Sequence, residues 1–383
     1  MITSEALGIT RLEAVRFFVR SIDQHARFWG ELLDLATVGE SRAANAAATN
    51  QKSRVFRAGD ATVVLTEPLA HSSRSARYLK RHPDGVGELV FGVKDVNQTY
   101  QILNERGATP TSTVTEAPDE FGLARWFSIA TPFGDTLFTF VEHQEFRSIL
   151  PEFQLFSDAT SRNNRYGFSH IDHITSNFLT LAPMVLWCKN VLGLQQYWGI
   201  EFHTDDVATE TVHGSGLKSI VLWDPYSGVK FANNEPLQPY FEQSQIYTFV
   251  EDNHGPGVQH IALGIDNIME SLPELRRSGL TFMPTPQTYY EMLPQRLDRL
   301  KLSLEESITD LQTLELLVDG EGPGRYLLQI FTKELSKVCN DEKAGPFFLE
   351  IIQRKGDRGF GGGNFRALFE SIEREQRSTG RVK

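Results

Sequence analysis

Cysteine is scarce in this sequence: its 383 residues include only two, Cys188 and Cys339. Neither belongs to a CxxC pair, so the sequence offers neither a disulfide framework nor a cysteine-rich zinc site. A chain of this length can bury enough apolar surface for two ordinary domains without disulfides. We therefore expect a cytoplasmic protein with reduced thiols that is stabilised by hydrophobic packing.

Long apolar runs and excess positive charge are also missing. No uncharged apolar run approaches the roughly 20 residues that a membrane-spanning helix needs. The first residues, MITSEA, lack the basic start and apolar stretch of a signal peptide. Acidic residues outnumber basic ones by 49 to 38, and the formal charge of -11 argues against a surface for nucleic acid or anionic lipid. We expect neither nucleic acid nor membrane among the partners.

The two halves of the chain resemble each other, which indicates an internal duplication. Each half has the order strand, helix and several strands, and short segments match at corresponding places. The matching pairs are residues 12–15 (LEAV) with 171–174 (IDHI), 65–69 (LTEPL) with 233–237 (NNEPL), and 85–93 (GVGELVFGV) with 257–265 (GVQHIALGI). Helices with a 3.6-residue apolar period are predicted over residues 22–33, 96–106, 181–191 and 268–277, with Gly107, Gly193 and Gly279 at or near the ends of the last three.

A strand–helix–strands module that is used four times predicts an α+β fold of two open β-barrels, each made of two βαβββ modules. The polar segment 156–166 has the composition of a linker, so we expect an N-terminal domain at 1–155 and a C-terminal domain at 165–383. A glycine-rich run, residues 359–363, precedes a last helix at 364–377, for which Asn364 is the predicted N-cap. We interpret the run as a hinge that lets this helix act as a lid.

The candidate metal ligands are polar residues inside apolar strands. Glu350 stands in the run 347–354 (FFLEIIQR), and burying a lone carboxylate is costly unless it is paired or binds a metal. His173 and His260 stand in similar settings, and two histidines with one carboxylate are the ligands of a non-haem Fe(II) oxygenase. A core histidine, or an ion pair of Glu350 with Arg354, is the alternative reading of each residue alone. Strand alternation predicts that Asp172 points away from His173.

The duplication strengthens the metal interpretation. The first-half counterparts of His173, His260 and Glu350 are Ala14, Glu88 and Thr139. Because all three positions differ together between the halves, we expect a metal site in the second half and a scaffold in the first. His170 and His254 are second-choice ligands, and we expect the remaining histidines, His25 and His82 among them, to contact solvent.

The same segments together resemble the 4-hydroxyphenylpyruvate dioxygenases, a family of the vicinal oxygen chelate superfamily. The resemblance covers essentially the whole chain and is strongest from about residue 167 onward. It is carried by residues 171–173 (IDH), 257–262 (GVQHIA), 328–333 (LQIFTK), 348–354 (FLEIIQR), 359–361 (GFG) and 363–365 (GNF).

The resemblance implies two vicinal-oxygen-chelate domains, Fe(II) bound by His173, His260 and Glu350, and a homo-oligomer, either a dimer or a tetramer. The implied reaction takes the small molecule 4-hydroxyphenylpyruvate and O2 to homogentisate and CO2, with oxidative decarboxylation, ring hydroxylation and side-chain migration. The pathway served, tyrosine breakdown or quinone and tocopherol synthesis, stays open. The implied catalytic residues are Gln245, Gln259 and Gln329, and the implied substrate-binding residues are Ser219, Asn234, Phe331, Phe360, Asn364 and Phe365.

Three alternatives are weighed against this reading. A 4-hydroxymandelate synthase uses the same iron and substrate but hydroxylates the benzylic carbon; Asn234 and Phe365 match the dioxygenases, whereas Ala232 and Tyr247 depart from them. A catalytically inactive protein that binds an aromatic ligand would not need three intact ligand positions. A zinc hydrolase would need a general base beside the ligands, and no residue marks one.

Overall fold

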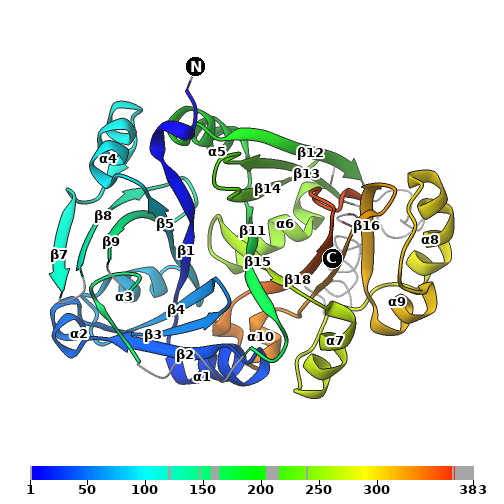
Figure 1. Cartoon of the computed structure of the whole chain (residues 1–383), viewed down its shortest axis with the longest axis horizontal. Helices are drawn as coiled ribbons and strands as arrows, with labels where there is room; N and C mark the ends of the chain where they lie inside the picture. Colours follow the sequence, from blue (N-terminus) through cyan, green and yellow to red (C-terminus); the bar gives the residue numbers. More distant parts are fainter. Residues whose placement is uncertain are drawn as a thin grey trace.

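The chain folds into two curled β-sheets with helices around them (Figure 1). The structure is a computed structural model, and it describes residues 2–119, 122–145, 148–156, 164–203, 215–238, 240–364 and 366. The first sheet holds β1 (Ile9–Phe18), β2 (Ala36–Ser41), β3 (Gln51–Ala58), β4 (Ala61–Pro68), β5 (Gly85–Val93), β6 (Thr109–Pro110), β7 (Thr115–Asp119), β8 (Gly122–Ala130), β9 (Leu137–Gln144) and β10 (Phe153–Leu155). The second holds β11 (Phe168–Asn177), β12 (Gln195–His203), β13 (Gly216–Trp223), β14 (Lys230–Pro236), β15 (Gly257–Ile265), β16 (Leu317–Gly322), β17 (Arg325–Phe331) and β18 (Phe348–Lys355).

The strand orders confirm the duplication. The first sheet contains the order β2-β3-β4-β1-β5-β9-β8, and the second contains β12-β13-β14-β11-β15-β18-β17. The central strands also pair in the same senses, since β1 runs parallel to β4 and antiparallel to β5, as β11 does to β14 and β15. The α+β fold with two half-barrel sheets is therefore confirmed.

The strand registers also fix which residues correspond. Ala14 pairs with Val90 as His173 pairs with Ala262. On the next strand Val90 pairs with Thr139, as Ala262 pairs with Glu350. The alignment that makes Ala14 and Thr139 the counterparts of His173 and Glu350 is thus confirmed in three dimensions.

The helices that the apolar period predicts are present. Residues 22–33 form α1 (Ile22–Ala26) and a π-helical turn at Arg27–Leu32, and residues 181–191 form α5 (Ala182–Trp187) and a π-helical turn at Cys188–Leu192. The other two are α4 (Val96–Glu105) and α7 (Ile268–Arg277), and Gly107, Gly193 and Gly279 all have positive φ. Further helices are α2 (Ala43–Thr49), α3 (Arg74–Leu79), α6 (Gln245–Asp252), α8 (Gln287–Leu300), α9 (Ile308–Leu314) and α10 (Leu335–Val338), and short 3-10 turns lie at Glu5–Leu7, Phe241–Gln243 and Glu342–Ala344.

One hydrophobic cluster runs through both halves. Phe231 of β14 packs against Phe91, Phe133 and Phe138 of the first half, with ring centroids 5.7 to 6.3 Å apart. Aromatic contacts of this kind bury large areas and hold the two sheets together.

Two histidines that we expected in solvent are buried. Nε2 of His25 lies 2.9 Å from a carboxylate oxygen of Asp84, and Nδ1 of His82 lies 2.7 Å from the carbonyl oxygen of Asn253 in the other half. The expectation was wrong because the polar sequence around each histidine becomes a contact surface when the halves pack together. Both nitrogens of His82 and Nε2 of His25 have hydrogen-bond partners, whereas Nδ1 of His25 is buried without one among the described residues.

The C-terminal prediction needs one correction. Residues 362–364 are already helical, so Asn364 lies inside the first turn and is not the N-cap. Its Oδ1 instead accepts hydrogen bonds from the hydroxyl of Tyr289 (2.8 Å) and from Arg296 (3.2 Å) on α8. The rest of the predicted lid helix, apart from residue 366, and the linker residues 157–163 lie outside the described residues, as does Phe365.

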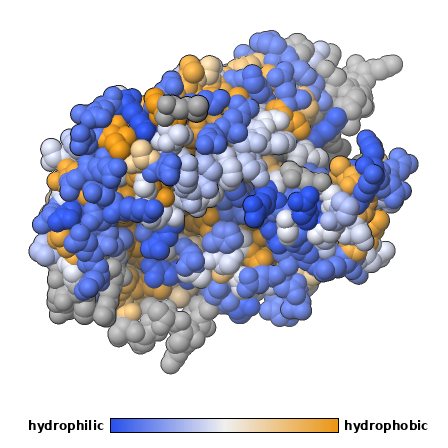
Figure 2. Space-filling model, turned by 45° about the horizontal axis from the view of Figure 1, so that its top comes forward, coloured by the Kyte–Doolittle hydropathy of each residue, from blue (hydrophilic) through white to orange (hydrophobic). Residues whose placement is uncertain are grey.

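The surface is mainly polar. Hydrophilic side chains cover most of the face drawn in Figure 2, and hydrophobic ones show between them in small groups. Among the described residues, no helix is both long and apolar enough to cross a membrane.

Candidate metal centre and active site

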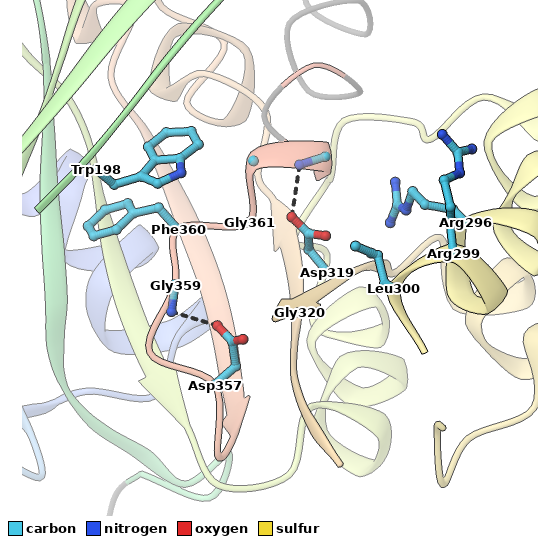
Figure 3. A pocket seen from close by; sticks show the side chains of 12 residues that line it. Trp198, Arg296, Arg299, Leu300, Asp319, Gly320, Asp357, Gly359, Phe360 and Gly361 are labelled. Carbon is cyan, nitrogen blue, oxygen red and sulfur yellow. Dashed lines mark hydrogen bonds between the residues drawn. The ribbon is translucent and has the colours of Figure 1, made fainter. Parts of the chain in front are cut away.

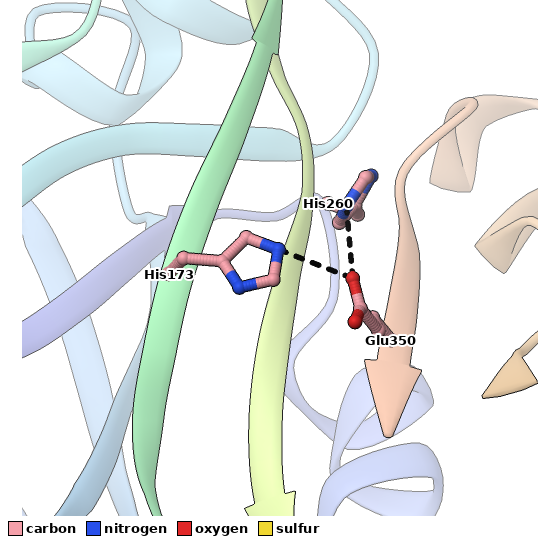
Figure 4. A group of neighbouring side chains, drawn as sticks. All are labelled: His173, His260 and Glu350. Atoms are coloured by element: carbon pink, nitrogen blue, oxygen red, sulfur yellow. Dashed lines mark ion pairs between the residues drawn. The ribbon is translucent and has the colours of Figure 1, made fainter. Parts of the chain in front are cut away.

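Three side chains from three strands converge on one face of the second sheet. His173 lies on β11, His260 on β15 and Glu350 on β18 (Figure 4). Nε2 of His173 lies 3.1 Å, and Nε2 of His260 lies 3.5 Å, from Oε2 of Glu350. One potential ligand atom of each residue lies within 4.8 Å of the other two, and all three residues are buried. Two imidazole nitrogens and one carboxylate oxygen arranged in this way fit a single divalent transition-metal ion.

Burial and neighbouring charges shift the pKa values of these three residues in different directions. Burial alone would raise the pKa of Glu350, but the two imidazoles beside it lower the pKa to about 2. Burial lowers the pKa of His260, and Glu350 compensates only in part. At His173 the effect of burial is outweighed by the carboxylates of Glu350 and Asp172, and the pKa is raised. Glu350 is therefore an anion at neutral pH, as a metal-binding carboxylate must be.

A β-bulge at Asp172 overturns the alternation that the sequence predicts. Ile171 pairs with Leu263 and His173 pairs with the next residue, Ala262, so Asp172 has no partner of its own on β15. The extra residue brings Oδ1 of Asp172 to 2.9 Å from Nδ1 of His173. The expectation that Asp172 points away from His173 is therefore wrong.

Arg354 pairs with Asp172 and not with Glu350. Its Nε lies 2.6 Å from Oδ2 and its Nη2 lies 2.7 Å from Oδ1 of Asp172. Burial would raise the pKa of Asp172, but the hydrogen bonds from Arg354 and His173, with the imidazole of His170 at 3.8 Å, hold it well below its usual value. The alternative reading of Glu350, an ion pair with Arg354, is thus not what the structure has.

A second bulge lies at Gln259, immediately before His260 on β15. Oε1 of Gln259 lies 3.2 Å from Nδ1 of His260, and its amide nitrogen donates to Oε1 of Gln245 at 3.0 Å. Gln245 is the first residue of α6. The two glutamines therefore lie side by side behind one histidine of the site.

Aromatic rings flank the three side chains. The ring of Phe348 stacks on His260 with centroids 4.8 Å apart, and that of Phe331 lies 5.9 Å from His260. On the other side the ring of Phe360 lies 4.9 Å from His173. These apolar walls keep water away from the polar group. Sequence reasoning missed Phe348, although its place two residues before Glu350 on β18 puts it on the same face.

Several buried polar atoms on this face have no partner within the described residues: Oγ of Ser219, Oδ1 of Asn234, Oγ1 of Thr175 and Nδ2 of Asn177. Ser219 and Asn234 pair across β13 and β14, and Asn234 donates to Oδ1 of Asn177 at 3.0 Å. Thr175 and Asn177 were missed from the sequence, yet they follow His173 at steps of two along β11 and so share its face. Buried polar atoms of this kind are suited to bind a polar ligand.

The remaining candidates differ in their burial and in their contacts. Gln329 on β17 is buried and alternates with Phe331 on one face. His170 and His254 do not join the ligands: the side chain of His170 is 54% exposed, and Nδ1 of His254 lies 2.9 Å from the carbonyl oxygen of Arg81.

A pocket of about 310 Å³ opens beside the centre, at the glycine-rich run. Its lining includes Trp198, Arg296, Arg299, Asp319, Phe360 and the three glycines at 361–363 (Figure 3). Phe360 is common to this pocket and to the wall of the metal centre. The pocket is thus joined to His173 through Phe360, and its lining does not include His173, His260 or Glu350.

The first half has an ion pair where the second half has His173, His260 and Glu350, the three candidate metal ligands. Nη1 of Arg16 lies 3.0 Å from Oε2 of Glu88, the hydroxyl of Thr139 donates to Glu88, and Arg16 also pairs with Glu152. Among the described residues, the first half has no group of histidine, cysteine and acidic side chains placed to hold a metal. A guanidinium therefore neutralises the buried carboxylate there.

Comparisons with known proteins decide the family. The chain is 36% identical over 327 residues to the 4-hydroxyphenylpyruvate dioxygenase of Dictyostelium discoideum, and the match covers 84% of this chain and 86% of the relative. The chain belongs to the 4-hydroxyphenylpyruvate dioxygenase family. The family enzyme of Coccidioides posadasii is also 36% identical, over 343 residues, which are 85% of this chain and 82% of that protein.

The fold comparison places this family in a wider group. Residues 11–137 match the model of the glyoxalase, bleomycin resistance protein and dioxygenase superfamily. A substituted form of 4-hydroxymandelate synthase from Streptomyces coelicolor superposes with a TM-score of 0.79 at 26% identity, covering 96% of this chain and 99% of the synthase chain. Membership of the 4-hydroxyphenylpyruvate dioxygenase family implies an enzyme with a metal cofactor, and the group of His173, His260 and Glu350 has the donors for it.

Proposed function

We propose that the chain is a non-haem Fe(II) dioxygenase that converts 4-hydroxyphenylpyruvate and O2 to homogentisate and CO2. The observation that carries the proposal is the convergence of His173, His260 and Glu350 from three strands within 4.8 Å. Two histidines and one carboxylate leave other positions of the metal open, which is the requirement of an oxygenase rather than of a structural metal site. The family relationship supplies the substrate.

The donor atoms fit Fe(II). Both imidazoles present Nε2 to Glu350, while Asp172 and Gln259 face the Nδ1 atoms of His173 and His260. Hydrogen bonds at Nδ1 fix the ring orientation that ligation through Nε2 requires. Iron bound there would bind the 2-oxo acid of the substrate and activate O2 for decarboxylation and ring hydroxylation.

The residues around the ligands would hold the substrate and exclude water. We propose that Phe331 and Phe360 flank the aromatic ring, with Phe365, which lies outside the described residues. Polar groups of the substrate would bind the buried amides and hydroxyls nearby, because burial leaves these groups few other partners. These buried amides and hydroxyls belong to Ser219, Asn234, Gln245, Gln259, Gln329 and Asn364.

The test is oxygen uptake with 4-hydroxyphenylpyruvate by protein loaded with Fe(II), with the product identified. We expect uptake that depends on Fe(II) and yields homogentisate and CO2. Turnover that is unaffected by His260→Ala, or protein that binds no metal, would reject the proposal in favour of a sequestering protein without iron chemistry.

A second candidate, 4-hydroxymandelate synthase, has one observation in its favour: a synthase shares the fold over nearly the whole chain. Ala232, which departs from the common dioxygenase residue, packs with Phe360 and Val221 on the face of the site. Tyr247 departs as well, but its ring packs against Phe241 on the other side of α6. Identification of 4-hydroxymandelate as the main product would establish the synthase.

We also propose the division of labour between the halves. Residues 1–155 would be a scaffold domain without a metal that also carries the contacts of a homo-oligomer, and residues 165–383 would be the catalytic domain. The cytoplasm is the proposed compartment, supported by two free cysteines. Sedimentation of the purified protein would give the oligomeric state.

A further inference from the structure

Asp172 lies between a metal ligand candidate and an arginine. Its Oδ1 is 2.9 Å from Nδ1 of His173, and both of its oxygens contact Arg354, at 2.6 and 2.7 Å. Two parallel N–H···O bonds of this kind fix a carboxylate in the plane of the guanidinium. Lys230 adds a second cation, with Nζ 3.8 Å from Oδ1. The carboxylate is thus held by Arg354 and Lys230 as well as by the imidazole.

Arg354 also reaches the loop that covers the site. Its Nη1 donates to the carbonyl oxygen of Gly359 at 2.7 Å, and Gly359 directly precedes Phe360 in the chain. The ring of Phe360 packs on His173 with centroids 4.9 Å apart. The contacts therefore form a ring. His173 contacts Asp172, Asp172 contacts Arg354, Arg354 contacts Gly359, and the neighbouring Phe360 contacts His173.

We propose that Asp172 and Arg354 are positioning residues for His173: they hold the imidazole with Nδ1 donating to Asp172 and Nε2 directed at the metal, and they hold Phe360 against the same ring. The inference rests on the proposed metal site. An anionic acceptor at Nδ1 makes an imidazole a better metal ligand and prevents ring rotation. Among the described residues, Nδ1 of His260 has the neutral amide oxygen of Gln259 as its partner, at 3.2 Å, so the two histidines are held by partners of different strength.

The first half provides the contrast. The same bulge is present there, because Leu12 pairs with Phe91 and Ala14 pairs with the next residue, Val90, which leaves Glu13 in the place of Asp172. Glu13 pairs with Arg11, which is mainly exposed, at 2.9 Å. The bulge itself therefore needs no buried pair with an arginine, and the contacts of Asp172 with His173 and Arg354 are a feature of the half with the metal ligands.

The first experiment measures metal affinity by anaerobic titration with Fe(II), and with Co(II) as a spectroscopic probe. We expect Asp172→Asn to weaken binding by about 10- to 100-fold, the usual effect of removing an outer partner of a metal-binding histidine. Asp172→Glu, which keeps the charge, should recover part of the affinity. The matched control is Glu13→Gln, which changes the equivalent bulge residue of the first half and should leave the affinity unchanged.

The second experiment reads the tautomer without metal or turnover. In metal-free Glu350→Gln protein in alkaline buffer, in which no carboxylate faces Nε2, the ¹⁵N shifts of His173, assigned by comparison with His173→Gln, should show the proton on Nδ1, and the further substitution Asp172→Asn should allow the other tautomer. Arg354→Gln should weaken metal binding less than Asp172→Asn but should also raise the KM for 4-hydroxyphenylpyruvate, because the loop with Phe360 loses its anchor.

The outcomes separate this inference from the proposed function. If the unsubstituted protein binds no metal, the proposed function fails, and the tautomer measurement still decides the role of Asp172. If it binds metal and a folded Asp172→Asn protein binds it equally well, the positioning role is rejected. If Asp172→Asn does not fold, the same titration on Arg354→Gln decides, and unchanged affinity together with unchanged KM rejects the inference.

Discussion

Glu88 and His260 occupy the same position in the two sheets of this molecule. Glu88 pairs across β1 and β5 with Arg16, and His260 pairs across β11 and β15 with Thr175. The first half thus places a guanidinium beside its buried carboxylate, where the second half brings two imidazoles and a carboxylate into a group that could hold a metal. Each half thus has a buried carboxylate with nitrogen groups beside it: a guanidinium in the first half and two imidazoles in the second.

This relationship predicts that the first-half ion pair contributes stability and no catalysis. Glu88→Ala leaves the buried guanidinium of Arg16 with Glu152 as its remaining carboxylate, and breaking a buried pair in this way costs about 3–5 kcal/mol. We expect that loss in the free energy of unfolding from urea denaturation. Metal content per folded chain should not change, and a variant as stable as the parent would contradict the prediction.

Glu350→Gln should abolish metal binding while the protein still folds. The amide carries no negative charge, so the site loses its anionic ligand. We expect the metal affinity to fall by more than the about 100-fold that the loss of an outer partner can cause. The matched control is Thr139→Val, the same strand position in the first half, which should keep full metal content. Anaerobic titration with Fe(II) measures both, and oxygen uptake should be lost only in Glu350→Gln.

Both cysteines should be inert in the native protein. Burial raises the pKa of Cys188 well above its usual value and that of Cys339 to about 11. Because the thiolate is the reactive form, little of it exists at neutral pH. A thiol reagent should therefore modify Cys188 only after denaturant is added, and should modify the partly exposed Cys339 far more slowly than a free thiol. Rapid reaction of either cysteine in folded protein, at the rate of a free thiol, would contradict this.

Tyr289→Phe should destabilise the protein more than Tyr290→Phe. The hydroxyl of Tyr289 accepts from the buried N–H of Val318 at 2.7 Å and donates to Asn364, so its removal leaves a buried donor without a partner, at a cost of about 1–3 kcal/mol. Among the described residues, the hydroxyl of Tyr290 has the carbonyl oxygen of Leu316 and the side chain of Thr285 as partners and no backbone N–H, so its loss should cost about 1 kcal/mol or less. Urea denaturation of the two variants provides the comparison, and equal losses would disprove the assignment.

The repeat and its unequal positions could be read from the sequence because their signals are local. Apolar context singled out His173, His260 and Glu350, and matched segments aligned them with Ala14, Glu88 and Thr139. Strand pairing then placed the counterparts in register. Helix ends were equally accessible, since a glycine after an apolar period needs only the chain itself to be recognised.

What the sequence determined by itself is which residues share strands and which positions differ between the halves. The tertiary structure alone decided which side chains are in contact and which are buried. Asp172 contacts His173, Arg354 pairs with Asp172 and not with Glu350, and His25 and His82 are buried. The physical reason is that a β-bulge is set by the register of two strands, and burial by the packing of two sheets. The sequence of one strand contains neither, so alternation along it fails at the residues beside the candidate metal ligands.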